Sequence, residues 1–128
     1  MRTILLIDDE RNFLKSLADA LKDYIGDWGK GKVEDWNIVT AENGKQGTEV
    51  LDSQQVDLVV TDLRMPLMDG FELLSYVRRK SPRIPVIVMT ASDCADLDDR
   101  LAAMGAAWCL RKPFKISDMA MTIAGQLA

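Results

Sequence analysis

The sequence predicts a single α/β domain of the doubly wound class, built on a five-stranded parallel sheet with helices on both faces. Short apolar runs rich in β-branched residues alternate with longer segments whose apolar residues recur every three or four positions. These are the patterns of buried strands and amphipathic helices. Five such pairs follow one another without a linker, repeat or low-complexity segment. Strict alternation of this kind favours parallel strands joined by right-handed crossovers, so we expect one domain over residues 1–128.

The first half of the chain supplies two strand–helix pairs. Residues 3–7 form an apolar run suited to a buried strand, and residues 11–25 carry the spacing of an amphipathic helix. The connection over 26–35 is rich in glycine and lysine and longer than is usual between such elements, so it is either a partner surface or a tolerated insertion. Residues 36–41 form a second strand, and an Asn-Gly turn leads into a helix over 45–53.

The second half supplies three further pairs, whose ends are set by proline, glycine and serine. The expected strands are residues 58–62, 85–90 and 107–110, and the expected helices are 71–80, 95–104 and a last one for which Ser117 is a suitable N-cap. Proline is tolerated at the first position of a strand, where residue 85 stands. Gly105 follows the fourth helix in the position that commonly ends one.

Composition and charge narrow the class of protein. The chain is 48% hydrophobic and 28% charged, which is typical of a folded domain. Its net charge of −4 gives no reason to expect nucleic acid or an anionic membrane as a direct partner. No apolar run approaches the roughly 20 residues of a membrane span, and the first residues show no h-region with a cleavage site, so we expect no secretion signal. We therefore expect a cytoplasmic protein in which Cys94 and Cys109 are reduced thiols rather than a disulfide.

The chain contains no histidine. This excludes Ser-His-Asp and Cys-His catalysis, histidine-based metal sites and a phosphohistidine carried by this chain. Any chemistry must therefore depend on carboxylates, hydroxyls, lysine and the backbone.

Polar residues follow the ends of the expected strands. Asp8 and Asp9 follow the first strand, Asp62 ends the third, Thr90 ends the fourth, and Lys112 follows the fifth. Parallel strands bring their carboxyl ends to one edge of the sheet. If the strand order is 2-1-3-4-5, the first and third strands are neighbours at the topological switch point, and the three carboxylates converge there.

Converging carboxylates repel one another unless a cation or a proton intervenes. Hard oxygen ligands with room for water suit Mg²⁺. Bound metal and Lys112 would offset the charge of a phosphoryl group arriving at Asp62, and Thr90 could donate a hydrogen bond to it. We therefore predict that Asp62 is the reactive residue, a nucleophile that needs neutralisation and positioning more than a general base.

Four segments together resemble the receiver domain of two-component response regulators. They are Ile-Leu-Leu-Ile-Asp-Asp-Glu at 4–10, Val-Val-Thr-Asp-Leu-Arg-Met-Pro-Leu-Met-Asp-Gly at 59–70, Val-Ile-Val-Met-Thr-Ala at 86–91 and Lys-Pro-Phe at 112–114. The resemblance covers essentially the whole chain and implies the 2-1-3-4-5 strand order. It also implies a signalling switch that catalyses its own phosphorylation but turns over no external substrate.

The resemblance assigns roles to the acidic residues. Asp62 would accept a phosphoryl group from the phosphohistidine of a sensor histidine kinase or a histidine phosphotransfer protein. Asp9, Asp62 and the backbone carbonyl of Arg64 would hold Mg²⁺, with Asp8 helping through water.

The resemblance also implies how phosphorylation is read. Thr90, the backbone of Ala91 and Lys112 would contact the phosphoryl oxygens, and the bond between Lys112 and Pro113 would be cis. Phosphorylation would alter the surface around the fourth helix, fifth strand and fifth helix, through which two copies could form a homodimer.

One position departs from the family pattern, and two others stand where the family varies the lifetime of the phosphoryl group. Cys109 stands where the family usually has a tyrosine or phenylalanine whose ring swings inward, and a cysteine cannot make that movement. Trp108 is adjacent but should point to the opposite side of its strand. The positions that tune phosphoryl lifetime are Arg64 and Ser92, and we expect Arg64 to alter autodephosphorylation.

Other functions remain open at this stage. A pseudo-receiver would use the same fold as an interaction module without phosphorylation. An aspartyl phosphohydrolase of the haloacid-dehalogenase type would carry its two aspartates two apart after the first strand, whereas Asp8 and Asp9 are adjacent. A flavin-binding domain would need a phosphate cradle in place of these acids. The sequence is compatible with a stand-alone receiver and with a receiver joined to an effector domain.

Overall fold

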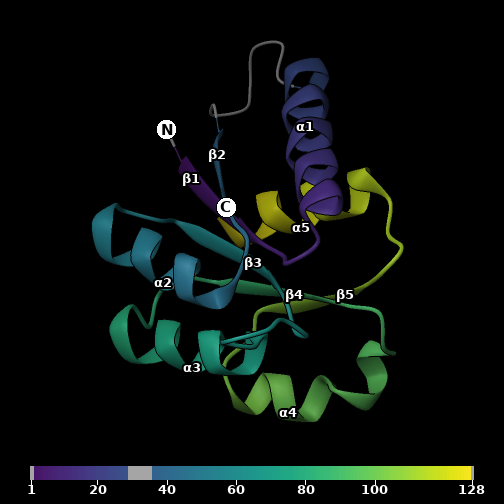
Figure 1. Cartoon of the computed structure of the whole chain (residues 1–128). Coiled ribbons are helices and arrows are strands. Elements are labelled where there is room, and N and C mark those ends of the chain that lie inside the picture. The colour runs from purple at the N-terminus through teal and green to yellow at the C-terminus, as the bar shows by residue number, and fades with distance from the viewer. Residues whose placement is uncertain (1, 29–35, 128) are drawn as a thin grey trace.

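The computed structural model describes residues 2–28 and 36–127, and one parallel sheet lies between two layers of helices (Figure 1). The strands are β1 (Arg2–Ile7), β2 (Trp36–Ala41), β3 (Leu58–Asp62), β4 (Val86–Thr90) and β5 (Trp108–Arg111), in the order β2-β1-β3-β4-β5. The helices are α1 (Arg11–Trp28), α2 (Gly44–Ser53), α3 (Gly70–Lys80), α4 (Asp98–Ala103) and α5 (Ile116–Leu127), with a 3₁₀ turn η1 (Cys94–Asp96) before α4. The predicted fold class and strand order are confirmed.

The central strands are apolar on both faces because helices cover both faces. Successive side chains point to opposite sides, so each strand contributes to two separate cores. Toward α1 and α5 lie Ile4, Leu6, Leu58, Val60, Ile87 and Met89. Toward α2, α3 and α4 lie Leu5, Ile7, Val59, Val86 and Val88. Figure 1 shows the same division, with α1 and α5 on one face and the other three helices on the opposite face.

The connection from β3 to α3 fixes the place of Asp62, the last residue of the central strand. The backbone N–H of Gly70 donates a hydrogen bond to the carbonyl of Leu63 (2.9 Å), which closes the intervening loop. Asp69 caps α3, because its Oδ1 accepts a hydrogen bond from the backbone N–H of Glu72 (2.8 Å). The start of α3 therefore packs directly against the backbone that carries Asp62.

The fourth helix differs from the expected continuous helix over 95–104. The carboxylate of Asp93 accepts a hydrogen bond from the backbone N–H of Ala95 (3.0 Å) and starts the 3₁₀ turn η1, after which α4 begins at Asp98. Gly105 follows α4 with φ of +91°, a conformation that favours glycine, as predicted.

The start of the last helix also differs from expectation. Ser117 lies inside the first turn of α5 and is not its N-cap. The carbonyl of Lys115 accepts the hydrogen bonds of Asp118 (3.0 Å) and Met119 (3.2 Å), so the helix begins at Ile116.

Two further expectations concern the chain outside the sheet. Of the long connection predicted over 26–35, α1 extends through Trp28, and residues 29–35 lie outside the described residues. Within residues 2–28 and 36–127, no helix combines the length and the apolar character needed to cross a bilayer.

Candidate functional site

Three carboxylates meet at the carboxyl edge of the sheet, as the sequence predicts. Ile7 of β1 pairs with Thr61 of β3, so the residues that follow these two positions are brought together. Asp8, Asp9 and Asp62 each place a carboxylate oxygen within 4.8 Å of the others. Asp8 is buried, Asp62 is partly buried and Asp9 is exposed, so the cluster is open to solvent on one side.

Asp8 forms the innermost part of the cluster, with 1% of its side chain exposed. One carboxylate oxygen accepts a hydrogen bond from Lys112 Nζ (2.6 Å), and the other accepts one from the backbone N–H of Glu10 (2.9 Å). This buried carboxylate is therefore paired with a cation and hydrogen-bonded, as a charge removed from water must be.

Asp62 is less well compensated. Its Oδ1 accepts a hydrogen bond from the backbone N–H of Leu63 (2.8 Å), whereas its Oδ2 lies 3.4 Å from Lys112 Nζ. Burial raises the pKa of Asp62, and the Asp8 charge adds to the rise, while the charge of Lys112 opposes it. The Leu63 N–H orients the Asp62 carboxylate. Ionisation of this carboxylate costs more free energy in the fold than in water, because the group is partly buried.

Lys112 connects the two carboxylates. Burial alone would lower its pKa, but the hydrogen bond to Asp8 and the charge of Asp62 outweigh burial and raise the pKa of Lys112. Its ammonium also lies 4.2 Å from the centre of the Phe13 ring, a contact that the sequence did not suggest. The bond from Lys112 to Pro113 is cis, as expected.

Thr90 ends β4 beside this cluster, with 3% of the residue exposed. Its hydroxyl oxygen accepts a hydrogen bond from the backbone N–H of Ser92 (3.0 Å), and its carbonyl accepts one from the backbone N–H of Lys112 (2.7 Å). Ala91 is exposed, as is the side chain of Arg64 in the β3–α3 loop. Thr90 is therefore hydrogen-bonded both to the segment that follows β4 and to the segment that follows β5.

The donor set fits a hard divalent cation. Three carboxylates face one ammonium group, so the cluster keeps a net negative charge when all four groups are ionised. Carboxylate oxygens with an open, solvent-facing side are the ligands that Mg²⁺ prefers.

The raised pKa of Asp62 leads to a prediction about stability. When the folded-state pKa exceeds the unfolded-state pKa, the ionised carboxylate destabilises the fold above that pKa, and the penalty disappears as the pH falls through it. In a chelator at pH 7, Asp62→Asn should therefore raise the thermal midpoint by a few degrees, the change that about 1 kcal/mol produces in a domain of this size. Thermal unfolding followed by circular dichroism checks this.

The control for this prediction is Asp52→Asn. Lys80 and Tyr76 hold the pKa of Asp52 below its usual value, so that substitution should not stabilise the fold. Added Mg²⁺ should raise the midpoint of the wild type more than that of Asp62→Asn, because the variant loses a metal ligand. An Asp62→Asn protein no more stable than wild type at pH 7 would contradict the stated electrostatics.

The chain is similar to many proteins of one family. The family model of the response regulator receiver domain matches residues 4–124. The chain belongs to this family. The receiver is 38% identical over 112 residues to the transcriptional regulatory protein GlrR of Escherichia coli (strain K12), covering 86% of this chain and 22% of that protein. It is 31% identical over 127 residues to the probable transcriptional regulatory protein TcrX of Mycobacterium tuberculosis, covering 98% of this chain and 49% of that protein.

The receiver therefore spans less than half the length of these two relatives. Among solved structures, it resembles the response regulator protein TrrA from Thermotoga maritima, solved in complex with Mg²⁺-BeF. The sequences are 28% identical, the TM-score is 0.79, and the match covers 99% of this chain and all of that chain (100%).

The two cysteines of the receiver form a disulfide, so the prediction of reduced thiols was wrong. Cys94 in η1 and Cys109 in β5 have Cα atoms 6.0 Å apart, within the range that a disulfide spans. The prediction rested on the expected compartment alone. The available signal was the spacing of the cysteines, since Cys94 lies just after the fourth predicted strand and Cys109, 15 residues later, lies in the fifth.

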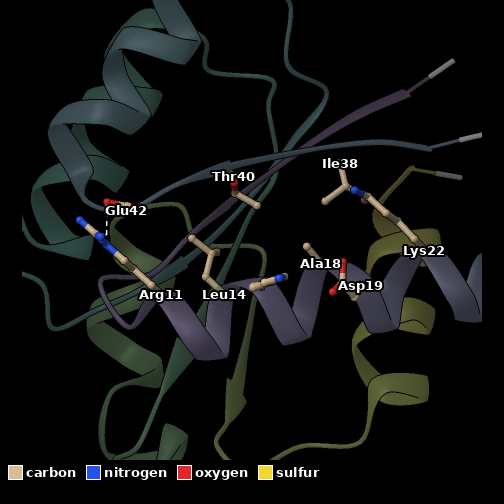
Figure 2. Close-up of a pocket in the computed structure, with 9 residues that line it drawn as sticks. Arg11, Leu14, Ala18, Asp19, Lys22, Ile38, Thr40 and Glu42 are labelled. Carbon is tan, nitrogen blue, oxygen red and sulfur yellow. Dashed lines mark ion pairs between the residues drawn. The ribbon is translucent and has the colours of Figure 1, made fainter.

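The receiver also carries a groove of about 370 Å³ between α1 and the edge strand β2 (Figure 2). At one end Arg11 forms an ion pair with Glu42 (3.1 Å), and Asp19 and Lys22 lie toward the other end. Arg11, Lys15 and Lys22 line the groove together with Asp19 and Glu42, so it carries charges of both signs. The reactive candidates remain at the carboxyl edge.

Proposed function

We propose that this receiver is a phosphoacceptor switch in which Asp62 takes a phosphoryl group from the phosphohistidine of a sensor histidine kinase or a histidine phosphotransfer protein. The observation that carries the proposal is the cluster at the sheet edge, where a partly buried carboxylate faces one ammonium group and two further acids suited to a metal. The Mg²⁺-BeF complex of TrrA supports it, because that relative binds this pair of ligands.

The transfer step makes one bond and breaks one. A carboxylate oxygen of Asp62 attacks phosphorus while the phosphorus–nitrogen bond of the phosphohistidine breaks and the imidazole leaves. The backbone N–H of Leu63 orients the attacking carboxylate, and Lys112 Nζ offsets charge on the transferred group. Mg²⁺, held by Asp9, Asp62 and the Arg64 carbonyl with Asp8 assisting through water, would neutralise further phosphoryl charge.

The phosphoryl group is then read by the segment after β4. The Thr90 hydroxyl accepts from Ser92 in the structure and keeps its own proton to donate to a phosphoryl oxygen. The backbone N–H of Ala91 supplies a second donor. Movement of these residues would alter the surface formed by α4, β5 and α5.

That surface is the proposed output face and the place where two copies would meet. Trp108 and Met121 are 56% and 60% exposed and border a hollow of about 320 Å³ on α5. Trp108 points to the α5 side of β5, as predicted, and Cys109 to the α4 side. We further propose that the chain acts in the cytoplasm, turns over no external substrate and makes no direct contact with nucleic acid.

The test of this function is the intact mass of the protein after incubation with acetyl phosphate, with and without Mg²⁺. The wild type should gain the mass of one phosphoryl group only when Mg²⁺ is present, and Asp62→Asn should gain none. A folded wild type that acquires no adduct would overturn the proposal and favour a phosphorylation-independent pseudo-receiver.

A further prediction concerns the lifetime of the phosphoryl group. Arg64 stands two residues beyond Asp62, and its side chain is exposed. We expect Arg64→Ala to change the half-life of the adduct about fivefold, the effect of altering the hydrolysis barrier by about 1 kcal/mol when a charged side chain near the phosphoryl group is removed. Adduct mass against time, after removal of the phosphodonor, measures this, and an unchanged half-life would contradict the assigned role.

A further inference from the structure

The disulfide ties the segment that leaves the phosphoryl-binding edge to the last strand of the sheet. Cys94 stands only four residues after Thr90, the residue proposed to contact the phosphoryl group. Cys109 lies in β5, opposite Val88 of β4. The bond between the two sulfurs therefore closes a loop that contains α4 and begins almost at the proposed switch residue.

The helix that this loop encloses is short. α4 has six residues. Leu101 is buried, and Leu97 and Met104 at the ends of the helix pack against the same core. The Arg100 guanidinium stacks on the Phe71 ring of α3 at 3.8 Å. A covalent tie at Cys94 consequently limits how far the chain between Thr90 and α4 can move relative to the sheet.

The disulfide is also within reach of solvent. Both cysteines are partly exposed, and a hollow of about 300 Å³ lies beside them, lined also by Leu101, Ala102 and Trp108. A small thiol can approach sulfur there, unlike at a disulfide enclosed in a core. In the proposed cytoplasmic setting, where disulfides are transient and redox-sensing rather than permanent, such access allows the bond to form and break.

We propose that Cys94 and Cys109 are a reversible thiol–disulfide pair that controls how readily the receiver adopts its phosphorylated arrangement. This inference rests on the proposed function, because it concerns regulation of the same site. Two molecules of a small thiol reduce the disulfide to two protein thiols and leave as one small disulfide. The reverse reaction, with glutathione disulfide as oxidant, restores the bond and releases two glutathione thiols.

The disulfide is present in the unphosphorylated arrangement, and this indicates whether oxidation favours or opposes phosphorylation. In that arrangement the Thr90 hydroxyl accepts from the Ser92 N–H, and Cys94 is held against β5. The oxidised pair therefore favours the unphosphorylated arrangement, and reduction releases the loop after β4. Because coupling between two equilibria is reciprocal, a phosphoryl group or its analogue must also make the disulfide easier to reduce.

The experiment compares the affinity of oxidised and reduced protein for beryllofluoride in the presence of Mg²⁺, by calorimetry. Each redox state is confirmed first by the number of thiols that an alkylating reagent modifies. The oxidised form should bind beryllofluoride about fivefold or more weakly than the reduced form, the lower end of typical coupling between sites. In Cys94→Ala, which leaves the acidic cluster intact, the same redox treatments should leave the affinity unchanged.

The possible failures are distinguishable. If neither redox state binds beryllofluoride or gains a phosphoryl adduct, the proposed function fails and this inference fails with it. If both states bind equally well, the receiver function stands and redox control is overturned. An equal redox effect in Cys94→Ala, or thiols that glutathione disulfide never oxidises, would also overturn redox control.

Discussion

Gly70→Ala is expected to lower the free energy of unfolding by about 3 kcal/mol, the upper part of the range for overpacking a site that cannot relax. A methyl group at this position would meet the carbonyl oxygen of Asp62 and would lie 2.7 Å from Cα of Leu63. Both neighbours are backbone atoms of the segment that carries the proposed phosphoacceptor, so neither can move without displacing the site. Urea unfolding of the variant and the wild type measures the difference.

Gly125→Ala is the matched control. Gly125 lies in α5, and a Cβ atom there would meet nothing within 4 Å. Alanine favours a helix over glycine by about 1 kcal/mol, so this variant should be slightly more stable than the wild type. If Gly70→Ala were as stable as Gly125→Ala, the close packing of α3 on the Asp62 backbone would be wrong.

Lys112→Met is expected to destabilise the protein by about 3 kcal/mol at pH 7 in a chelator, because removing one partner of a buried ion pair leaves an uncompensated charge. The charge left behind is chiefly that of Asp8, which is 1% exposed and receives the 2.6 Å hydrogen bond from Lys112. Mg²⁺ should recover part of the loss, since a cation replaces the missing charge. Lowering the pH should act in the same direction through Asp62, whose pKa is raised by burial.

Lys80→Met provides the comparison for Lys112→Met. Lys80 also forms an ion pair with an aspartate, Asp52, but both side chains are about half exposed. Exposed pairs contribute little to stability, so this variant should unfold close to the wild type. Equal stabilities of the two lysine variants without Mg²⁺ would show that the acidic cluster does not depend on Lys112.

The fold, and the acidic residues at the carboxyl edge of the sheet, could be predicted from the sequence. Alternation of strand and helix patterns predicted the parallel sheet, and the positions of Asp8, Asp9 and Asp62 at the carboxyl ends of its strands predicted that their carboxylates meet. These predictions succeeded because hydrophobic periodicity is visible in short stretches of sequence. The order of the elements then determines which strand ends meet at one edge of the sheet.

Features that depend on distances between remote segments were not predictable. Lys112 lies closer to Asp8 than to Asp62, at 2.6 Å against 3.4 Å, and no motif in the sequence encodes this difference. The Cys94–Cys109 disulfide was missed for the same reason. The sequence predicted a reducing compartment, but it did not show that the two sulfur atoms lie close together.

The errors at helix ends have a local cause. Side-chain and carbonyl acceptors compete within one turn, and the sequence does not show which acceptor is used. The Asp93 carboxylate caps a 3₁₀ turn where a continuous helix was expected. At the start of α5, the carbonyl of Lys115 accepts the first hydrogen bonds, and Ser117 is not the N-cap.

The central claim is that the carboxylate of Asp62 carries the phosphoryl group, and chemical trapping tests it most directly. Protein treated with acetyl phosphate and Mg²⁺ is reduced with borohydride, which converts an aspartyl phosphate to homoserine, and is then digested and sequenced by mass spectrometry. We predict homoserine at position 62, only when Mg²⁺ is present. Homoserine at Asp8, at Asp9 or at any other aspartate, or at none, would contradict the account.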